Sequence, residues 1–226
     1  KFYRPGRWSD AQILEEHDFC FELVEQELPV VPPLRNPQGR SLHPYGGQRF
    51  SLFKRQGGRA PELDHEDNLS IIGRLLARIH RVGERFPFRH RPRIDLQRFA
   101  IDSFELISAE FMPAELKPAY DSLARDLLAV MEQRFDDCRS VRYLRVHGDC
   151  HAGNLLWRDT GPHFVDFDDT RMAPAMQDLW MLLSGEPERQ QQQLGRIVEA
   201  YRQFREFDPR ELQLIEVLRT LRIMHY

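Results

Sequence analysis

Hydrophobic and polar positions change their spacing near residue 56. Up to that point they predict short strands, at Lys1–Tyr3 and Arg49–Phe53, arranged around a single helix. From residue 57 onward, apolar residues recur at intervals of three and four, which is typical of amphipathic helices. The pattern therefore predicts a small, mostly β part with one helix, followed by a larger and mainly helical part.

The helix of the first part has clear signals at both ends. Ser9 can cap its start, Gln12 completes a capping box three residues later, and Trp8 can pack against Ile13. Pro29 is expected to stop the helix, because proline cannot continue it. Between these signals the helix carries Leu14, Phe19, Phe21, Leu23 and Leu28.

Further helices are predicted in the second part. Asp64 can cap a helix that ends near Gly83, and a long helix begins after Pro118. Another amphipathic stretch covers residues 188–207, and Asp208-Pro209 begins the last helix. The apolar stripes of the first two helices are interpreted as core: Leu69, Ile72, Leu76 and Ile79 in one, and Tyr120, Leu123, Leu127, Met131 and Phe135 in the other.

One stretch interrupts the helical pattern with polar residues. The β-like run Val141–Val146 leads into the segment 147–154, whose sequence is His-Gly-Asp-Cys-His-Ala-Gly-Asn. Two short strands, Leu155–Trp157 and His163–Val165, then lead to the acidic segment 166–169. Buried carboxylates cost several kcal/mol unless they are paired or bind a metal. These residues are therefore expected to serve a function rather than stability.

Composition excludes several classes of protein. Among 226 residues, 41% are hydrophobic and 30% are charged, which argues against disorder. The net charge of −3 argues against a dedicated nucleic-acid binder, and no apolar run approaches the ~20 residues of a membrane helix. Cys20, Cys138 and Cys150 are too few and too scattered for a disulfide framework. We therefore expect a soluble, cytoplasmic monomer with no nucleic-acid or membrane partner.

Both ends of the sequence predict that it is part of a longer chain. Lys1 is not a start methionine, and it already opens a predicted strand. At the other end, an apolar helical pattern that includes Leu218 and Leu221 runs to Tyr226 without a stop signal. We therefore expect further residues on both sides.

The spacing of Asp149, Asn154 and Asp166 can bring three side-chain oxygens together. They are 5 and 12 residues apart, so a short loop and a hairpin can place them in one pocket. Such oxygens suit Mg²⁺, which binds one or two carboxylates together with substrate phosphates. Phosphoryl transfer needs the same set: one carboxylate orients the attacking hydroxyl and accepts its proton, and the other two groups hold the metal against the triphosphate.

These motifs resemble the aminoglycoside-phosphotransferase and choline-kinase branch of the protein-kinase-like superfamily. The resemblance rests on His147-Gly148-Asp149 with Asn154 and on Val165-Asp166-Phe167-Asp168, and it spans nearly the whole chain. Within this branch, Lys1–Pro5 and Gln177–Leu183 are most similar to bacterial stress response kinases, which are cytoplasmic Ser/Thr protein kinases. The resemblance implies ATP- and Mg²⁺-dependent phosphorylation of protein hydroxyls in a bacterial stress response, with the protein substrate unknown.

The resemblance also implies an α+β, protein-kinase-like fold with two lobes. Residues 1–56 would form part of a small, mostly β N-lobe with one helix, and residues 57–226 a larger, mainly helical C-lobe. The C-lobe would carry a catalytic loop at 147–154 and a metal-binding segment at 166–169. The Gly-rich strands of the N-lobe should precede Lys1 and are absent from this sequence.

By position, the resemblance gives catalytic roles to three residues. Asp149 matches the base, and Asn154 and Asp166 match the Mg²⁺ ligands, with Asp166 also counted as catalytic. Asp168 stands where conventional protein kinases have glycine, so their activation-loop switching is not expected. Whether Asp168 or Asp169 also contacts the metal stays open.

The resemblance also implies a nucleotide site. Lys1 matches the lysine that contacts the α- and β-phosphates of ATP. Glu16, rather than Glu15, matches the helix residue that forms an ion pair with this lysine. The hinge that meets the adenine would include Phe53, Lys54 and Gln56.

Several neighbouring residues have simpler interpretations. His147 is expected to brace the catalytic loop by hydrogen bonds, and Asp178 to cap or anchor it. Cys150 and His151 suggest a zinc site, but adjacent residues give poor tetrahedral geometry. The arginine-rich run from residue 85 to residue 93 is interpreted as a solvated face.

Three other functions remain as alternatives. A small-molecule alcohol kinase of the choline, homoserine or aminoglycoside type would share the chemistry and differ in its acceptor. A two-metal phosphoesterase would need an upstream Asp-x-His and a downstream Gly-Asn-His segment, which the sequence lacks. A pseudokinase or nucleotide-binding scaffold is disfavoured, because the base and both metal ligands are present.

Overall fold

The computed structural model describes residues 1–63, 65–159 and 161–225, which divide into two units. Unit 1 comprises Lys1–Pro92 and Tyr143–Phe207, and unit 2 comprises Arg93–Arg142 and the chain from Asp208 onward. The lobe boundary expected at residues 56 and 57 is a different division and stays a prediction. Asp64, predicted to cap a helix, lies outside the described residues.

Three short antiparallel strands in the order β1-β3-β2 begin unit 1. β1 is Phe2–Tyr3, β2 is His43–Tyr45 and β3 is Gln48–Phe50. β3 ends earlier than predicted. The Leu52 carbonyl accepts from the Leu34 N–H at 2.7 Å, so the backbone after β3 pairs with a different segment of the chain. Both predicted strands exist, and both are shorter than predicted.

Helix α1 (Asp10–Glu25) begins as predicted. The Ser9 Oγ accepts from the Gln12 N–H at 3.3 Å, and the Ser9 N–H donates to Gln12 Oε1 at 2.8 Å, which completes the capping box. The helix ends before Pro29, because Glu27 adopts left-handed backbone (φ 55°) and redirects the chain. Ile13, Phe19 and Leu23 form its buried side, whereas Leu14, part of the predicted stripe, is exposed.

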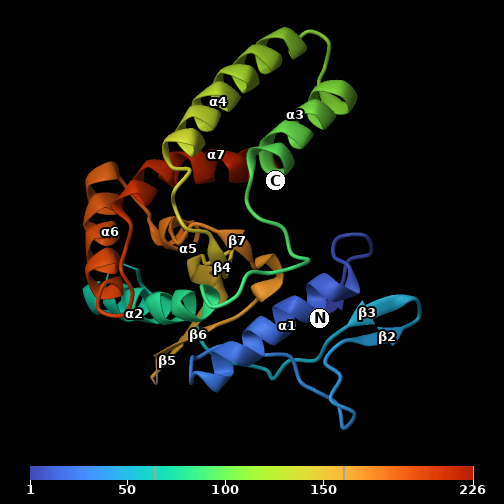
Figure 1. Ribbon diagram of the computed structural model, residues 1–226, viewed down its shortest axis with the longest axis vertical. Helices are drawn as coiled ribbons and strands as arrows, with labels where there is room; N and C mark the ends of the chain where they lie inside the picture. Colours follow the sequence, from blue (N-terminus) through green and yellow to red (C-terminus); the bar gives the residue numbers. More distant parts are fainter. Residues whose placement is uncertain (64, 160, 226) are drawn as a thin grey trace. The chain divides into compact units, whose positions relative to one another are not determined.

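Helices α2 (Glu66–Gly83) and α6 (Pro187–Tyr201) pack side by side in unit 1 (Figure 1). A Cβ at Gly73 would lie 2.6 Å from the Ile197 carbonyl oxygen, so glycine permits this close approach. The stretch predicted at 188–207 forms α6, which ends earlier. The predicted core stripe of α2 is confirmed, because Leu69, Ile72, Leu76 and Ile79 are all buried.

Two antiparallel strand pairs contain the three strands predicted around the polar segments, and the fourth strand, Arg171–Ala173, was not predicted. β4 (Leu144–Val146) pairs with β7 (Arg171–Ala173), and β5 (Leu155–Arg158) pairs with β6 (Gly161–Phe164). The polar segments therefore start just after β4 and β6. Short helices continue the chain: η3 (Ala152–Asn154), η4 (Phe167–Asp169), α5 (Met176–Leu179) and η5 (Trp180–Leu182).

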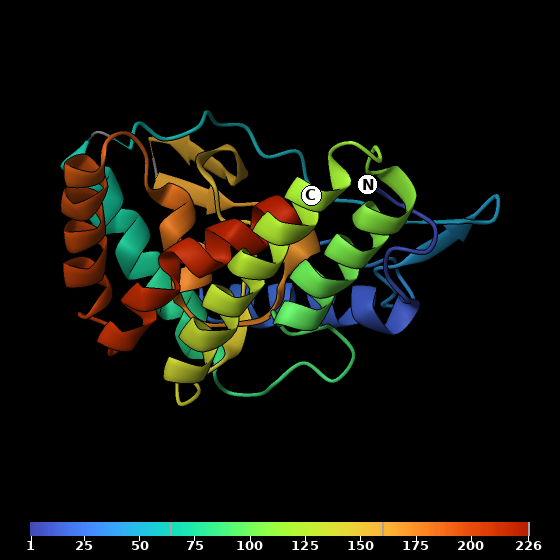
Figure 2. The same cartoon turned by 90° about the horizontal axis from the view of Figure 1, so that it is seen from above.

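Unit 2 is built of helices, among which α3 and α4 run beside each other (Figure 2). Asp208 caps the short helix η6, which leads directly into the last helix, α7. Its Oδ1 accepts from the Arg210 N–H at 3.0 Å, as its position predicts. The core stripe predicted for the helix after Pro118 is wrong in part: Met131 is buried, but Leu123 is 60% exposed, because only one side of α4 is covered. The bounds are η1 Gln97–Ile101, α3 Asp102–Leu106, η2 Ile107–Phe111, α4 Lys117–Asp137, η6 Pro209–Leu214 and α7 Ile215–His225.

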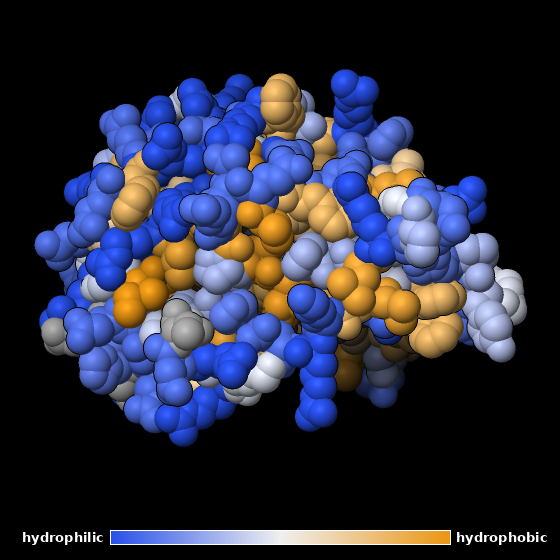
Figure 3. Space-filling model, turned by 90° about the horizontal axis from the view of Figure 1, so that it is seen from below, coloured by the Kyte–Doolittle hydropathy of each residue, from blue (hydrophilic) through white to orange (hydrophobic). Residues whose placement is uncertain are grey.

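Hydrophilic side chains dominate the face of the molecule in Figure 3, and hydrophobic ones gather near its middle. Cys20, Cys138 and Cys150 are buried free thiols. Among the described residues, no helix combines the length and the apolar character needed to cross a bilayer.

The capping box generates a stability prediction. Ser9→Ala should lower the free energy of unfolding by about 1 kcal/mol, because the first turn of α1 loses its side-chain acceptor. Ser122→Ala is the matched control, since Ser122 lies exposed within α4, where alanine is a good helix former. Urea denaturation measures both, and equal changes in the two variants would contradict the capping role.

Candidate active site

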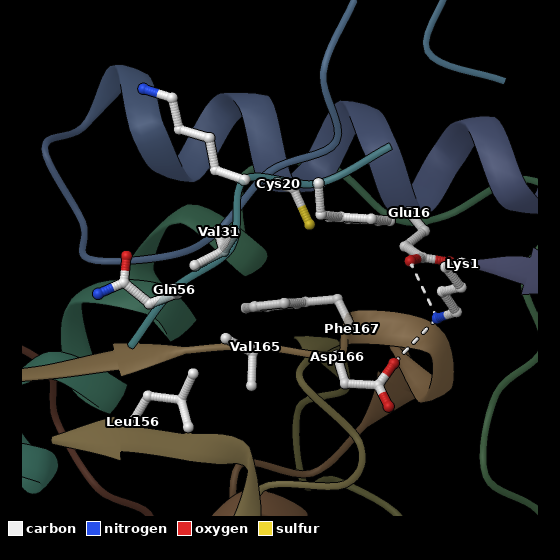
Figure 4. Close-up of a pocket in the computed structure, with 11 residues that line it drawn as sticks. Lys1, Glu16, Cys20, Val31, Gln56, Leu156, Val165, Asp166 and Phe167 are labelled. Carbon is white, nitrogen blue, oxygen red and sulfur yellow. Dashed lines mark hydrogen bonds and ion pairs between the residues drawn. The ribbon is translucent and has the colours of Figure 1, made fainter. Parts of the chain in front are cut away.

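A pocket of about 360 Å³ opens in unit 1 beside helix α1. Val31 and Leu156 belong to its apolar walls, while Lys1 and Asp166 lie at the opposite end from Gln56 (Figure 4). A pocket with apolar walls and one charged end can hold a flat group with a charged tail. The predicted hinge residues Phe53, Lys54 and Gln56 all line it.

Lys1 brings the acidic groups of the charged end together. Its Nζ lies 2.9 Å from Asp166 Oδ1, 2.9 Å from Asp168 Oδ1 and 3.9 Å from Glu16 Oε1. Burial lowers the pKa of Lys1, but the three carboxylates outweigh burial and raise that pKa above its usual value. The ammonium therefore stays charged at neutral pH.

Glu16 is buried, which is rare for a carboxylate. It is only 1% exposed, and burial raises its pKa to about 7 against the opposing effects of Arg91 and Lys1. The Arg91 guanidinium donates to Glu16 Oε2 at 2.8 Å, while Lys1 lies on the Oε1 side. Glu16 is therefore held between two cations, and Glu15 makes different contacts.

Two of the predicted site residues, Asp149 and Asn154, are in contact in the structure. The Asn154 Nδ2 donates to the Asp149 carbonyl at 2.9 Å and lies 3.4 Å from Asp149 Oδ2. The Asn154 carbonyl accepts from the Val165 N–H at 3.0 Å, which brings it close to the start of the segment that holds Asp166. The loop 147–154 and the segment 166–169 are thus joined at Asn154.

His147 braces the loop, as predicted. Its Nε2–H donates to the Val165 carbonyl at 2.9 Å, and its Nδ1 accepts from the Asp149 N–H at 3.3 Å. The ring also packs on Phe167, with 4.4 Å between the ring centroids. Both ring nitrogens are engaged and the residue is fully buried, so the geometry argues against His147 as a base.

Asp178 of helix α5 anchors the loop, which confirms that prediction. Its two oxygens accept the backbone N–H groups of His147 and Gly148, each at 2.8 Å, and the His80 Nε2–H at 3.0 Å. Burial raises the pKa of Asp178, but these hydrogen bonds outweigh burial and hold that pKa below its usual range. His80 also accepts from the Tyr201 hydroxyl at 2.9 Å, so the loop is tied to the helices α2 and α6.

Two backbone positions beside the site are unusual. Gly148 has a φ of 86°, and a Cβ there would clash with the Asp169 carbonyl oxygen. Asp166 has a φ of 59°, which is uncommon for a residue other than glycine and is typical of functional sites.

Asp168 and Asp169 are held by cations. Arg7 lies 3.0 Å from Asp168 Oδ2 and 2.9 Å from Asp169 Oδ1, and Arg171 lies 2.5 Å from the same Asp169 oxygen. With Lys1 on its other oxygen, Asp168 is paired on both sides. These ion pairs favour a role for Asp168 and Asp169 in holding neighbouring cationic side chains rather than in binding the metal directly.

Asn154 and Asp166 fit a hard cation. The Asn154 amide nitrogen faces Asp149, and no described group donates to Asn154 Oδ1. The Asp166 side chain is 57% exposed, with Lys1 on its Oδ1. An amide oxygen and one accessible carboxylate suit Mg²⁺, which keeps several waters and takes few protein ligands.

The structure argues against zinc at Cys150 and His151. Cys150 is fully buried, and burial raises the pKa of its thiol well above the usual value. Within the described ranges, no group of three His, Cys, Asp or Glu side chains is arranged to hold a metal ion.

Sequence reasoning missed Arg7 and Arg91. The interpretation of the arginine-rich run as a solvated face is wrong for Arg91, whose side chain is completely buried. Its partner Glu16 lies 75 residues earlier in the chain, so no local pattern could reveal the contact. Arg7 follows the first strand with no motif of its own.

Comparisons with known proteins show the family to which the chain is similar. The profile of the phosphotransferase enzyme family (APH) matches residues 1–215. Stress response kinase A of Escherichia coli (strain K12) is 46% identical over 227 residues, which cover 100% of this chain and 68% of that protein. Serine/threonine protein kinase RdoA of Salmonella typhimurium (strain LT2) is 44% identical over 228 residues, with the same coverage of 100% and 68%.

A solved structure shares the fold. Amicoumacin kinase hAmiN, in complex with AMP-PNP, Ca²⁺ and Ami, superposes with a TM-score of 0.76 at 20% identity, covering 96% of this chain and 69% of that chain. At this identity the likeness shows the fold alone. The predicted α+β, protein-kinase-like fold is confirmed.

Gly148 generates a prediction about the loop. Gly148→Ala should lower the free energy of unfolding by about 1–3 kcal/mol for the left-handed backbone and by roughly 1–3 kcal/mol more for the clash. Gly161→Ala should show the first effect alone, because Gly161 has a φ of 104° and no described atom near its Cβ position. Gly195→Ala, at an exposed site of α6, controls for the substitution itself. Equal losses at Gly148 and Gly161 in urea denaturation would refute the clash.

Proposed function

The chain belongs to the phosphotransferase enzyme family, and from this premise we propose that it phosphorylates Ser and Thr hydroxyls of proteins with ATP and Mg²⁺. Its relatives at 44–46% identity are named as a stress response kinase and as a Ser/Thr protein kinase, and each alignment covers the whole chain. We extend the stress-response role of those names to this chain as part of the same proposal.

One observation carries the proposal: Lys1 and Asp166 line the charged end of the pocket, and Asn154, in contact with Asp149, accepts the N–H of Val165, which also lines it. The apolar walls suit an adenine ring, with the backbone of residues 53–56 as its hydrogen-bonding edge. The triphosphate would then extend toward Lys1. This arrangement supports nucleotide binding and phosphoryl transfer in one site.

Each residue has a distinct part in the proposed reaction. Lys1 forms ion pairs with Asp166 and Asp168 in this structure. In the proposed reaction it would contact the α- and β-phosphates, while its ion pair with Glu16 keeps it at the charged end of the pocket. Asp149 would orient the acceptor hydroxyl and accept its proton. Asn154 and Asp166 would hold Mg²⁺, which bridges phosphate oxygens and neutralises the charge that develops during transfer.

The acceptor is the part of the proposal that depends on the relatives. A protein acceptor is favoured by the relative named as a serine/threonine protein kinase, which is 44% identical to this chain. Amicoumacin kinase hAmiN, which shares the fold, is only 20% identical. The chemistry at Asp149 is the same for both, because each acceptor offers an alcohol.

The two aspartates should separate catalysis from binding. Asp149→Asn should lower kcat by about 10²- to 10⁴-fold and leave ADP affinity unchanged, because Asp149 acts on the acceptor. Asp166→Ala should weaken Mg·ADP binding by roughly 10-fold or more, because a metal ligand is lost. Calorimetric titration with ADP and MgCl₂, and turnover with casein as acceptor, measure both effects.

Asp126→Asn is the matched control, since Asp126 lies exposed on α4. Parallel loss of binding and turnover in Asp149→Asn would contradict its role as base. Normal Mg·ADP binding by Asp166→Ala would contradict the metal assignment.

The acceptor class is tested with [γ-³²P]ATP. The protein is incubated separately with casein, with a bacterial protein extract, and with choline, homoserine and kanamycin. Label on Ser or Thr of polypeptide is the expected result, and Asp149→Asn should lower its rate of appearance by the same factor of about 10² to 10⁴. Label only on a small alcohol would replace the proposal with a small-molecule kinase.

A further inference from the structure

Arg91 joins two parts of unit 1 that the proposed reaction needs in fixed positions. Its guanidinium is completely buried and donates four hydrogen bonds. On one side it contacts α1, at the Gln12 carbonyl and at Glu16 Oε2, each at 2.8 Å. On the other side it contacts the carbonyls of Asp168 at 2.7 Å and Thr170 at 2.9 Å.

The loop that carries Arg91 is itself bound to α1. The Glu15 carboxylate accepts the backbone N–H groups of Arg89, His90 and Arg91 at 2.6, 2.9 and 2.8 Å. The Arg91 guanidinium also lies 4.5 Å from the centre of the ring of Trp8, a residue that precedes α1 in the chain. The loop and α1 therefore form one body near the charged end of the pocket.

The contacts of Arg91 require its particular shape. A guanidinium is planar and has five N–H donors on several edges, so it can serve acceptors on two sides at once. Lysine offers a single ammonium and cannot reach both. Loss of Arg91 would remove its guanidinium hydrogen bonds from Glu16 Oε2 and from three carbonyls, and lost hydrogen bonds to a buried carboxylate are unfavourable.

We propose that Arg91 is a positioning residue that fixes α1 to the metal-binding segment 166–169. The Lys1–Glu16 pair and Asp166 are then assembled together, without a regulated movement of α1. In protein kinases, helix position and activation-loop phosphorylation control the same two parts. Here one buried side chain holds both of them. This inference rests on the proposed function, because it assumes that the pocket binds Mg·ATP.

Arg91→Lys and Arg91→Met in the complete chain test the inference. Arg91→Lys keeps a cation near Glu16 and is the variant expected to remain folded; Arg91→Met removes the charge. Arg89→Met is the matched control, because the Arg89 side chain is exposed and only its backbone contacts Glu15. Melting temperature, amide hydrogen exchange and Mg·ADP affinity are measured on each.

In Arg91→Lys, amides of residues 10–25 and 166–170 should exchange faster in the nucleotide-free protein, while the rest of the protein stays folded. Mg·ADP binding should weaken by roughly 10- to 100-fold, as happens when supports of a metal site are removed. Binding of ADP without metal should change less. Arg89→Met should match the wild type in every measurement.

Two results would overturn the inference. Unchanged exchange of residues 10–25 in Arg91→Lys would show that this side chain does not hold α1. A lower melting temperature with unchanged Mg·ADP affinity would make Arg91 a stability residue only. Failure of the wild type to bind Mg·ADP would instead refute the proposed function, while the exchange measurement would still decide whether Arg91 fixes α1.

Discussion

The buried carboxylate of Glu16 is the constraint on which the candidate site depends. A carboxylate that is 1% exposed is unfavourable unless it is paired, and this one has Arg91 on one oxygen and Lys1 on the side of the other. Lys1 also contacts Asp166 and Asp168. The strand β1, the helix α1, the loop with Arg91 and the acidic segment must therefore meet at one point.

A second buried carboxylate fixes the catalytic loop in a similar way. Asp178 accepts two backbone N–H groups of the loop together with His80, and His80 contacts Tyr201. None of these anchoring contacts uses the Asp149 carboxylate. The helices α2 and α6 thus hold the loop through its backbone, and Gly148 lets it pass close to the Asp169 carbonyl.

The buried carboxylates of Glu16 and Asp178 position different parts of the candidate site. One holds the lysine and the acidic segment at the charged end of the pocket, and the other holds the loop that carries Asp149. Phosphoryl transfer depends chiefly on positioning and on stabilising charge. A site whose charged groups are fixed by buried partners on both sides meets that requirement. Arg91 matters in this picture because it reaches both α1 and the acidic segment.

The sequence by itself determined the features that depend on neighbours in the chain. The capping box at Ser9 and the core stripe of α2 were predicted correctly, and the three strands before the polar segments exist with somewhat different bounds, because each of these features rests on local spacing. The motif with Asp149, Asn154 and Asp166 pointed to the family. Only the tertiary structure decided that Leu123 of α4 stays exposed and that Arg91 is buried. Local sequence patterns predict that an arginine is exposed to solvent. The burial of Arg91 depends on acceptors about 75 residues away in the sequence, which only the folded chain brings together.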